Sequence, residues 1–350
     1  MGVMDSFLTN DALRRSFNDL GFITGSEALL PLLRQAYKAA CVSDITVLLE
    51  GETGTGKQVL AFAIHSLDQK RRAFPFVTMP CGSLSEALAE SELFGHLKGA
   101  FTGAVTHRKG LFQAAQCGTL FLDDINDLPP NIQAKLLDVL QRGAVRTIGS
   151  DAETQVDVRI IAASNQPLEP LVRKGLFRAD LYHRLNVVRL WLPPLRERMQ
   201  DLPNLVLAFA HRHGDIYRPI ESVEPDLVSF LQSQTFPGNV RELENDVQRM
   251  LFSKVCGTSL ELADWNHRSE GCRPADPPDL LGEAATRVLG AISAQGIPYA
   301  QAIEQLERRV LQAALNVGGR TRREIAQHLQ TSERTLYHKI RTYELRDQRP

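Results

Sequence analysis

The segment GETGTGKQ at residues 51–58 has the spacing of a loop that binds phosphate groups. It fits the pattern G-x-x-x-x-G-K, follows the apolar stretch ITVLLE and precedes the helical pattern VLAFAIHSL, which is the context this motif requires. Backbone N–H groups can surround phosphate oxygens there, while Lys57 supplies a point charge. Gln58 departs from the pattern, which has a magnesium-binding Ser or Thr at this position. The predicted nucleotide-binding residues of this phosphate-binding loop are Gly51, Glu52, Thr53, Gly54, Thr55, Gly56, Lys57 and Gln58.

Two carboxylates, Asp123 and Asp124, end the mainly apolar segment TLFLDDIN at residues 119–126. Ligands of open parallel sheets bind at the carboxyl ends of the strands. We therefore expect Asp123 to hold Mg²⁺, directly or through water, and Asp124 to orient the water that attacks the terminal phosphate of ATP. The pattern also fits an exposed acidic strand end, but the phosphate-binding loop upstream favours hydrolysis.

The order of apolar and helical segments along the chain predicts the elements that position the phosphate-binding loop and the two carboxylates. Between about residues 23 and 165, short apolar runs alternate with helical segments, which is typical of a parallel sheet wrapped by helices. Beyond Pro194 we expect no further strands, only a small helical subdomain. Residues 266–283 contain three prolines and mostly polar residues, so they predict a linker, and the segment that follows is helical again.

Length and composition predict a globular protein of two or three domains. Of the 350 residues, 43% are hydrophobic and 23% are charged, and the longest apolar runs are far shorter than a membrane span, so we expect no membrane partner and a cytoplasmic location. The five cysteines lack metal-ligand or paired spacing, which indicates neither a zinc site nor a disulfide framework. Residues 300–350 carry a net charge of +4 against −5 for the rest, which makes the basic end a candidate for nucleic acid.

Residues 99–104 read GAFTGA, in a stretch without a long apolar run. The glycines allow tight turns and the alanines add little bulk, so Phe101 and Thr102 should project at a loop tip and contact another molecule. The candidate contact residues are Gly99, Ala100, Phe101, Thr102, Gly103 and Ala104.

Together with FLDD, AASN, FRADLYHR and GNVREL in this order, these motifs resemble the AAA+ domain of bacterial enhancer-binding proteins, the activators of sigma-54 RNA polymerase. The resemblance covers about residues 22–255. It implies that ATP moves the GAFTGA loop against sigma-54, and that the chain forms a hexamer with itself or with a related activator. It also implies that Asn165 senses the γ-phosphate, that Arg178 and Arg184 reach a neighbouring subunit's nucleotide, and that Arg241 is a second sensor.

Two departures from the family bear on the rate of hydrolysis. The family usually has Asp-Glu where this chain has Asp123-Asp124, and an Asn at the position of Pro80, where it is thought to restrain the catalytic carboxylate. Because Asp is one methylene shorter than Glu, its carboxylate must either lie back by about 1.5 Å or be met by a backbone shift, and a displacement of that size can cost on the order of 10²-fold in rate. An ATP- and DNA-binding regulator with little hydrolysis is therefore the alternative function, while the GAFTGA segment favours the activator. A general chaperone-like remodeller is disfavoured by the basic end.

That basic end contains TRREIAQHLQTSERTLYHKIRTYEL, two short helical patterns in which Thr331 or Ser332 can cap the second. It resembles the Fis-type helix-turn-helix that such activators use to bind enhancer DNA. The start of the second helix would enter the major groove. The candidate DNA-binding residues are Arg334, Thr335, His338, Lys339 and Arg341.

The predicted fold is thus an α/β AAA+ sheet with a helical lid, followed by an all-α helix-turn-helix domain. The predicted divisions are a short N-terminal segment without a regulatory domain, the α/β ATPase subdomain, the helical lid subdomain, the linker and the DNA-binding domain, at residues 1–21, 22–194, 195–265, 266–283 and 284–350. Since residues 1–21 are too few for a sensing domain, control is expected from elsewhere, for instance from a separate regulatory protein.

Overall fold

The computed structural model describes residues 9–83, 85–100, 104–214, 219–254, 257–266, 298–316, 326 and 331–343. The chain divides into two compact units, residues 1–269 and residues 270–350, which are described separately.

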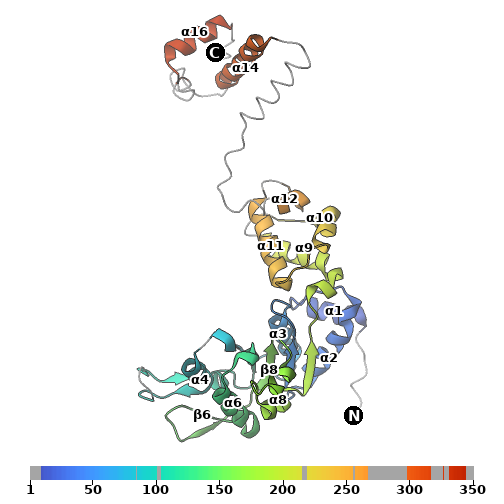
Figure 1. Cartoon of the computed structure of the whole chain (residues 1–350), viewed down its shortest axis with the longest axis vertical. Helices are drawn as coiled ribbons and strands as arrows, with labels where there is room; N and C mark the ends of the chain where they lie inside the picture. The colour runs from blue at the N-terminus through green and yellow to red at the C-terminus, as the bar shows by residue number, and fades with distance from the viewer. Residues whose placement is uncertain are drawn as a thin grey trace. The chain divides into compact units, whose positions relative to one another are not determined.

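A five-stranded parallel sheet is the centre of the first unit (Figure 1), with strand order β2-β5-β8-β1-β9. Its strands are β1 (Val47–Glu50), β2 (Phe76–Pro80), β5 (Thr119–Asp123), β8 (Arg159–Ser164) and β9 (Val188–Trp191). Four of these strands, β1, β2, β5 and β8, lie within residues 23–165, where the alternation of apolar runs and helical segments predicts a parallel sheet, and that prediction is confirmed. In this order β1 and β5 both flank β8, so the residues that follow β1 and β5 meet at one edge of the sheet.

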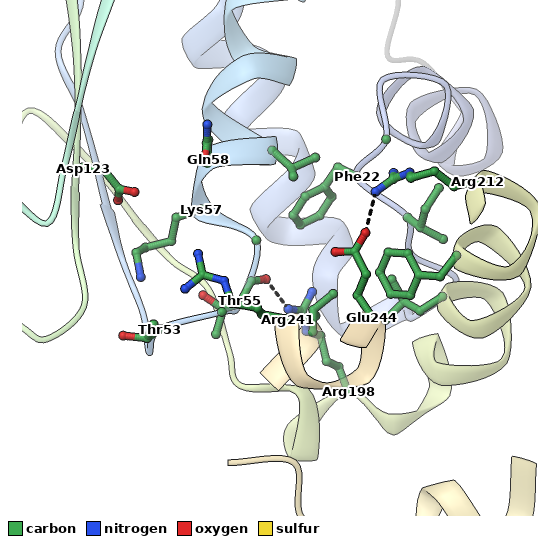
Figure 2. A pocket seen from close by; sticks show the side chains of 18 of the residues that line it. Phe22, Thr53, Thr55, Lys57, Gln58, Asp123, Arg198, Arg212, Arg241 and Glu244 are labelled. Atoms are coloured by element: carbon green, nitrogen blue, oxygen red, sulfur yellow. Dashed lines mark hydrogen bonds and ion pairs between the residues drawn. The ribbon is translucent and has the colours of Figure 1, made fainter. Parts of the chain in front are cut away.

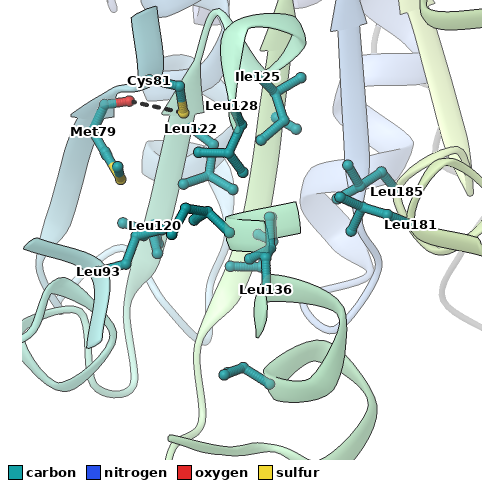
Figure 3. Close-up of a cluster of buried hydrophobic side chains, with 14 of the residues drawn as sticks. Met79, Cys81, Leu93, Leu120, Leu122, Ile125, Leu128, Leu136, Leu181 and Leu185 are labelled. Atoms are coloured by element: carbon teal, nitrogen blue, oxygen red, sulfur yellow. Dashed lines mark hydrogen bonds between the residues drawn. The ribbon is translucent and has the colours of Figure 1, made fainter. Parts of the chain in front are cut away.

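Buried side chains alternate between the two faces of the sheet, as expected for strands covered on both sides. Val47 and Leu49 pack on one face, which α1 (Asn10–Asn18), α2 (Leu30–Cys41) and α3 (Lys57–Leu67) cover. Leu48, Leu120 and Leu122 pack on the other face, and Figure 3 shows Leu120 and Leu122 there. The helices that contribute to that second cluster are α4 (Glu86–Phe94), α5 (Leu111–Ala114), α6 (Pro130–Arg142), α7 (Leu168–Arg173) and α8 (Ala179–Leu185).

A helical subdomain follows the sheet, as the sequence predicts. It contains the 3₁₀ turns η4 (Leu195–Glu197) and η5 (Met199–Asp201) and the helices α9 (Leu202–Gly214), α10 (Pro225–Gln232), α11 (Asn239–Ser253) and α12 (Leu262–Asn266). Its core joins Leu205 and Phe209 of α9 to Leu243 and Val247 of α11.

The expectation that strands end before Pro194 is wrong in one detail. The helical subdomain contains a short parallel pair, β10 (Ser222–Val223) with β11 (Ser259–Leu260). Two further short antiparallel pairs are separate from the main sheet: β3 (Gly95–His96) with β4 (Arg108–Lys109), and β6 (Ala144–Arg146) with β7 (Glu153–Gln155). Strands of two or three residues are too short for a periodic pattern, so sequence periodicity cannot reveal them. The remaining 3₁₀ turns are η1 (Glu27–Leu29), η2 (Cys81–Ser83) and η3 (Ile125–Asp127).

The second unit contains α14 (Tyr299–Asn316) and α16 (Glu333–Thr342), whose side chains Leu311, Leu315 and Leu336 form a small buried cluster with Ala326. Ser332 caps α16 by accepting a hydrogen bond from the backbone N–H of Thr335 at 3.0 Å. The first helix of the predicted helix-turn-helix lies outside the described residues except for Ala326. Across the described parts of both units, no helix combines the length and apolarity needed to cross a membrane.

Candidate nucleotide-binding site

The phosphate-binding loop leads from the end of β1 to the first residue of α3. Gly54 and Gly56 have φ angles of +79° and +102°, which glycine adopts readily. The buried Lys57 ammonium donates hydrogen bonds to the carbonyl oxygens of Gly51 at 2.7 Å and Glu52 at 3.0 Å. Burial lowers the pKa of Lys57. The loop therefore has the strand–glycine turn–helix geometry that its sequence predicts.

A cavity of about 250 Å³ adjoins this loop (Figure 2). Residues from the sheet, the N-terminal segment and the helical subdomain contribute to it. The lining residues are Gly21, Phe22, Ile23, Thr53, Gly54, Thr55, Gly56, Lys57, Gln58, Val59, Asp123, Asp124, Arg198, Leu205, Phe209, Arg212, Val240, Arg241 and Glu244.

The two predicted carboxylates lie on this cavity together with Lys57. Asp123 ends β5, and its Oδ1 accepts a hydrogen bond from the backbone N–H of Asp124 at 3.1 Å. Burial and the neighbouring carboxylate of Asp124 raise the pKa of Asp123, so a cation bound beside it would relieve an unfavourable charge. Asp124 has a φ of +51°, a conformation in which Asp is among the enriched residues.

The donor set fits Mg²⁺ held in the manner typical of nucleotide sites. No cluster of three or more His, Cys, Asp or Glu side chains that could hold a metal ion occurs among the residues that the structure describes. Mg²⁺ is commonly held by one or two carboxylates, with phosphates and waters as the other ligands. Asp123 is suited to that role, while Gln58 is exposed and carries no hydroxyl.

The other end of the cavity is apolar. Phe22 and Ile23 precede the sheet, Leu205 and Phe209 lie on α9, and Val240 lies on α11. At its rim, Arg212 on α9 pairs with Glu244 on α11 at 3.2 Å (Figure 2). A phosphate-binding end and an apolar end match the two halves of a nucleotide. The sequence did not identify these apolar residues, because ordinary core positions in three separate segments carry no distinctive motif.

Arg241, predicted as a second sensor, lines the cavity from α11, and its backbone N–H donates to the carbonyl oxygen of Gly54 at 3.3 Å. Asn165 follows β8, and its backbone N–H donates to Asn126 Oδ1 at 3.3 Å, but Asn165 does not line the cavity. Pro80 ends the edge strand β2 directly beside Asp123 in the parallel register, so no side-chain amide from that position accompanies the carboxylate.

The two predicted finger residues, Arg178 and Arg184, are exposed and do not line their own subunit's cavity. Arg178 forms an ion pair with Asp180 at 2.8 Å, and Arg184 donates to the carbonyl oxygen of Leu140 at 2.9 Å. Neither can serve the nucleotide site of its own chain in this arrangement.

The GAFTGA segment is described only at its flanks. The N–H of Gly99 donates to the carbonyl oxygen of Ala104 at 2.9 Å, so the two ends of the segment lie together. Ala100 also lies against Gly149, which follows β6. Phe101, Thr102 and Gly103 lie outside the described residues, and their predicted contact with a partner stays a prediction.

On α16, the predicted DNA-binding residues separate into two groups. Arg334, His338 and Arg341 are exposed, as is Tyr337, which is not among the predicted DNA-binding residues. Lys339 is paired with Glu307 of α14, and the hydroxyl of Thr335 is hydrogen-bonded to Ser332 at 2.6 Å. Spacing alone could not show that these two side chains have partners within the unit.

Comparisons with known proteins agree with this geometry. The Sigma-54 interaction domain model matches residues 22–191, and the AAA+ ATPase lid domain model matches residues 196–270. The DNA-binding transcriptional regulator NtrC of Azospirillum brasilense is 39% identical over 330 residues, with 90% of this chain and 68% of NtrC covered. The Nif-specific regulatory protein of Sinorhizobium fredii is 40% identical over 314 residues, with 90% of this chain covered but only 51% of that protein, so the chain spans about half its length. The crystal structure of NtrX from Brucella abortus in complex with ATP matches with a TM-score of 0.62 and 27% identity, covering 95% of this chain and 72% of NtrX.

Proposed function

Because the chain belongs to the AAA+ family of sigma-54-dependent transcriptional activators, we propose that it hydrolyses ATP to remodel sigma-54 RNA polymerase. One observation carries the catalytic half of this proposal: Lys57, Asp123, Asp124 and Arg241 line one cavity. The relatives favour this function over a regulator that binds ATP without hydrolysing it.

In the proposed reaction each polar residue has a separate task. Lys57 neutralises charge on the outer phosphates, and Asp123 holds Mg²⁺, which when bound offsets the charge of the phosphate oxygens. Asp124 orients and polarises the attacking water. The apolar end of the cavity, including Phe22 and Phe209, holds the adenine base of ATP.

The test of the catalytic proposal is steady-state ATP turnover with three variants. Asp124→Asn should lower turnover by at least about 100-fold, because the amide of Asn cannot act as a general base toward the attacking water. Asp124→Glu should retain turnover. Asp127→Asn, a matched change three residues further on and outside the cavity lining, should leave it unchanged. Turnover that is absent in the parent and appears in Asp124→Glu would establish the non-hydrolysing regulator instead.

The proposed active assembly is a ring, either of this chain alone or with a related activator. Arg178 and Arg184 then act on the nucleotide of the adjacent subunit, which accords with their exposure and their absence from their own cavity. Planar guanidinium groups suit the spread charge of a transferring phosphoryl group. GAFTGA would transmit the nucleotide state to sigma-54. A separate regulatory protein would control the assembly.

Residues 284–350 are proposed to bind enhancer DNA through α16. Arg341→Ala in the full chain should lower the slope of log affinity for duplex DNA against log salt by about 0.9, the value for one lost phosphate contact, without changing ATP turnover. Binding would be measured across a salt series. Thr342→Ala is the neighbouring control, because the hydroxyl of Thr342 donates to the backbone carbonyl oxygen of His338 within the helix. An unchanged slope in Arg341→Ala would remove Arg341 from the DNA interface.

A further inference from the structure

Glu52, the second residue of the phosphate-binding loop, does not line the cavity, although residues 53–58 all do. Its carboxylate instead binds the helical subdomain. Arg196 in η4 donates through both terminal nitrogens, to Oε1 at 2.6 Å and to Oε2 at 2.8 Å. Two parallel hydrogen bonds fix the relative orientation of the two groups as well as their distance.

Asn239, the first residue of α11, joins the same carboxylate. Its Nδ2 donates to Glu52 Oε2 at 3.1 Å and to the carbonyl oxygen of Thr53 at 3.0 Å. Its Oδ1 accepts from the backbone N–H of Leu195 at 2.8 Å. Asn239 is fully buried and has a φ of +55°, a conformation that Asn tolerates better than most residues. One side chain thus connects the loop, η4 and α11.

The contacts continue along the loop without interruption. The carbonyl oxygen of Gly54 accepts from Arg241, and that of Thr55 accepts from Arg198 at 2.6 Å. A side chain at position 54 would meet the Gly238 carbonyl oxygen at 2.2 Å from its Cβ, so the backbones approach closely. Residues 52–55 each therefore touch the helical subdomain, and Arg241 enters the cavity two residues after Asn239.

From this arrangement we infer that Glu52, Arg196 and Asn239 form a clamp that holds the helical subdomain on the phosphate-binding loop and orients Arg241 toward the phosphates. Glu52 is then a positioning residue for ATP turnover, an inference that rests on the proposed function. Arg196 and Asn239 lower the pKa of Glu52 to about 2, so the carboxylate stays charged throughout the neutral range. The ion-pair side chains are 47% and 39% exposed, so their loss should leave the fold intact.

The experiment compares Glu52→Gln, Arg196→Gln and Arg196→Lys with the parent chain. Gln keeps the size of Glu but loses its charge and one acceptor oxygen, and Lys keeps the charge of Arg but cannot form the paired hydrogen bonds. Glu169→Gln is the matched control, because Glu169 forms an exposed ion pair with Arg173 within α7. The readouts are the Kd for a fluorescent ADP analogue, the kcat for ATP, and hydrogen exchange at the N–H groups of Leu195 and Arg241.

For all three clamp variants we expect kcat to fall between about tenfold and 100-fold, as for a misplaced catalytic group, while Kd changes less than about threefold. Exchange at Leu195 and Arg241 should accelerate. The double variant Glu52→Gln/Arg196→Gln should have a kcat no lower than that of the slower single variant, because both changes break the same Glu52–Arg196 interaction. Glu169→Gln should match the parent.

Unchanged kcat and exchange in Glu52→Gln would overturn the clamp, and so would a weakened Kd with unchanged kcat, which would make Glu52 a ligand of the nucleotide. A parent chain without turnover would instead refute the proposed function. The exchange measurement would still decide the clamp in that case: faster exchange in the variants supports it, and equal exchange overturns it.

Discussion

Replacing Lys57 by alanine is expected to weaken ATP binding roughly 100-fold, because hydrogen bonds to charged groups contribute about 1.5–3 kcal/mol. Lys57 Nζ contacts only the carbonyl oxygens of Gly51 and Glu52 among the hydrogen bonds of the described residues, and it lies on the cavity. Lys57 belongs to none of the buried apolar clusters that the described residues form, so the variant should retain its secondary structure. Titration with a fluorescent ATP analogue measures the loss.

Lys38→Ala provides the control, because Lys38 is exposed on α2 and away from the cavity lining. It should bind ATP like the parent. Parent-like affinity in Lys57→Ala, together with an unchanged circular dichroism spectrum, would refute the assignment of residues 51–58 as the phosphate site.

Thr102→Ala should abolish activation of sigma-54 transcription while ATP turnover stays near the parent rate. The described flanks of the segment, Gly99, Ala100 and Ala104, do not line the nucleotide cavity, so hydrolysis should not require Thr102. Partner contacts concentrate binding energy in a few residues, and Thr102 can offer a hydroxyl and a methyl group beside Phe101. Transcription from a sigma-54 promoter and phosphate release, measured on the same preparation, test the separation of the two activities.

Thr106→Ala is the control for this pair of assays, because Thr106 is exposed just beyond the GAFTGA segment. It should activate normally. If Thr102→Ala also activates normally, the segment is not the sigma-54 contact; if it loses turnover, the residue acts in catalysis rather than in coupling.

The parts of the site that the sequence predicted are those encoded locally. Lys57 follows β1 and the glycine turn within one continuous motif, and Asp123 ends a strand of four buried residues. For both residues, the apolar strand pattern predicts that the side chain lies at the carboxyl end of a strand. The parallel order then brings them to one cavity, as ligand sites of such sheets require.

The parts that the sequence did not predict depend on tertiary contacts. Glu52 meets Arg196 and Asn239 across 144 and 187 residues, and nothing in GETGTGKQ indicates that its second side chain turns toward another subdomain. Strand β9 was not identified either, because it is a four-residue edge strand with Arg189 and Trp191 exposed. Lys339 was selected for DNA by charge and spacing, whereas its partner Glu307 lies on a separate helix.

Trapping a complex tests whether nucleotide chemistry in this chain acts on sigma-54. Purified chain and sigma-54 would be mixed with ADP and aluminium fluoride, which mimic the transition state of phosphoryl transfer, and separated by gel filtration. We predict a complex that elutes as one species with the mimic and is absent with ADP alone or with Lys57→Ala. Failure to form the complex with the mimic, or equal complex formation without nucleotide, would contradict it.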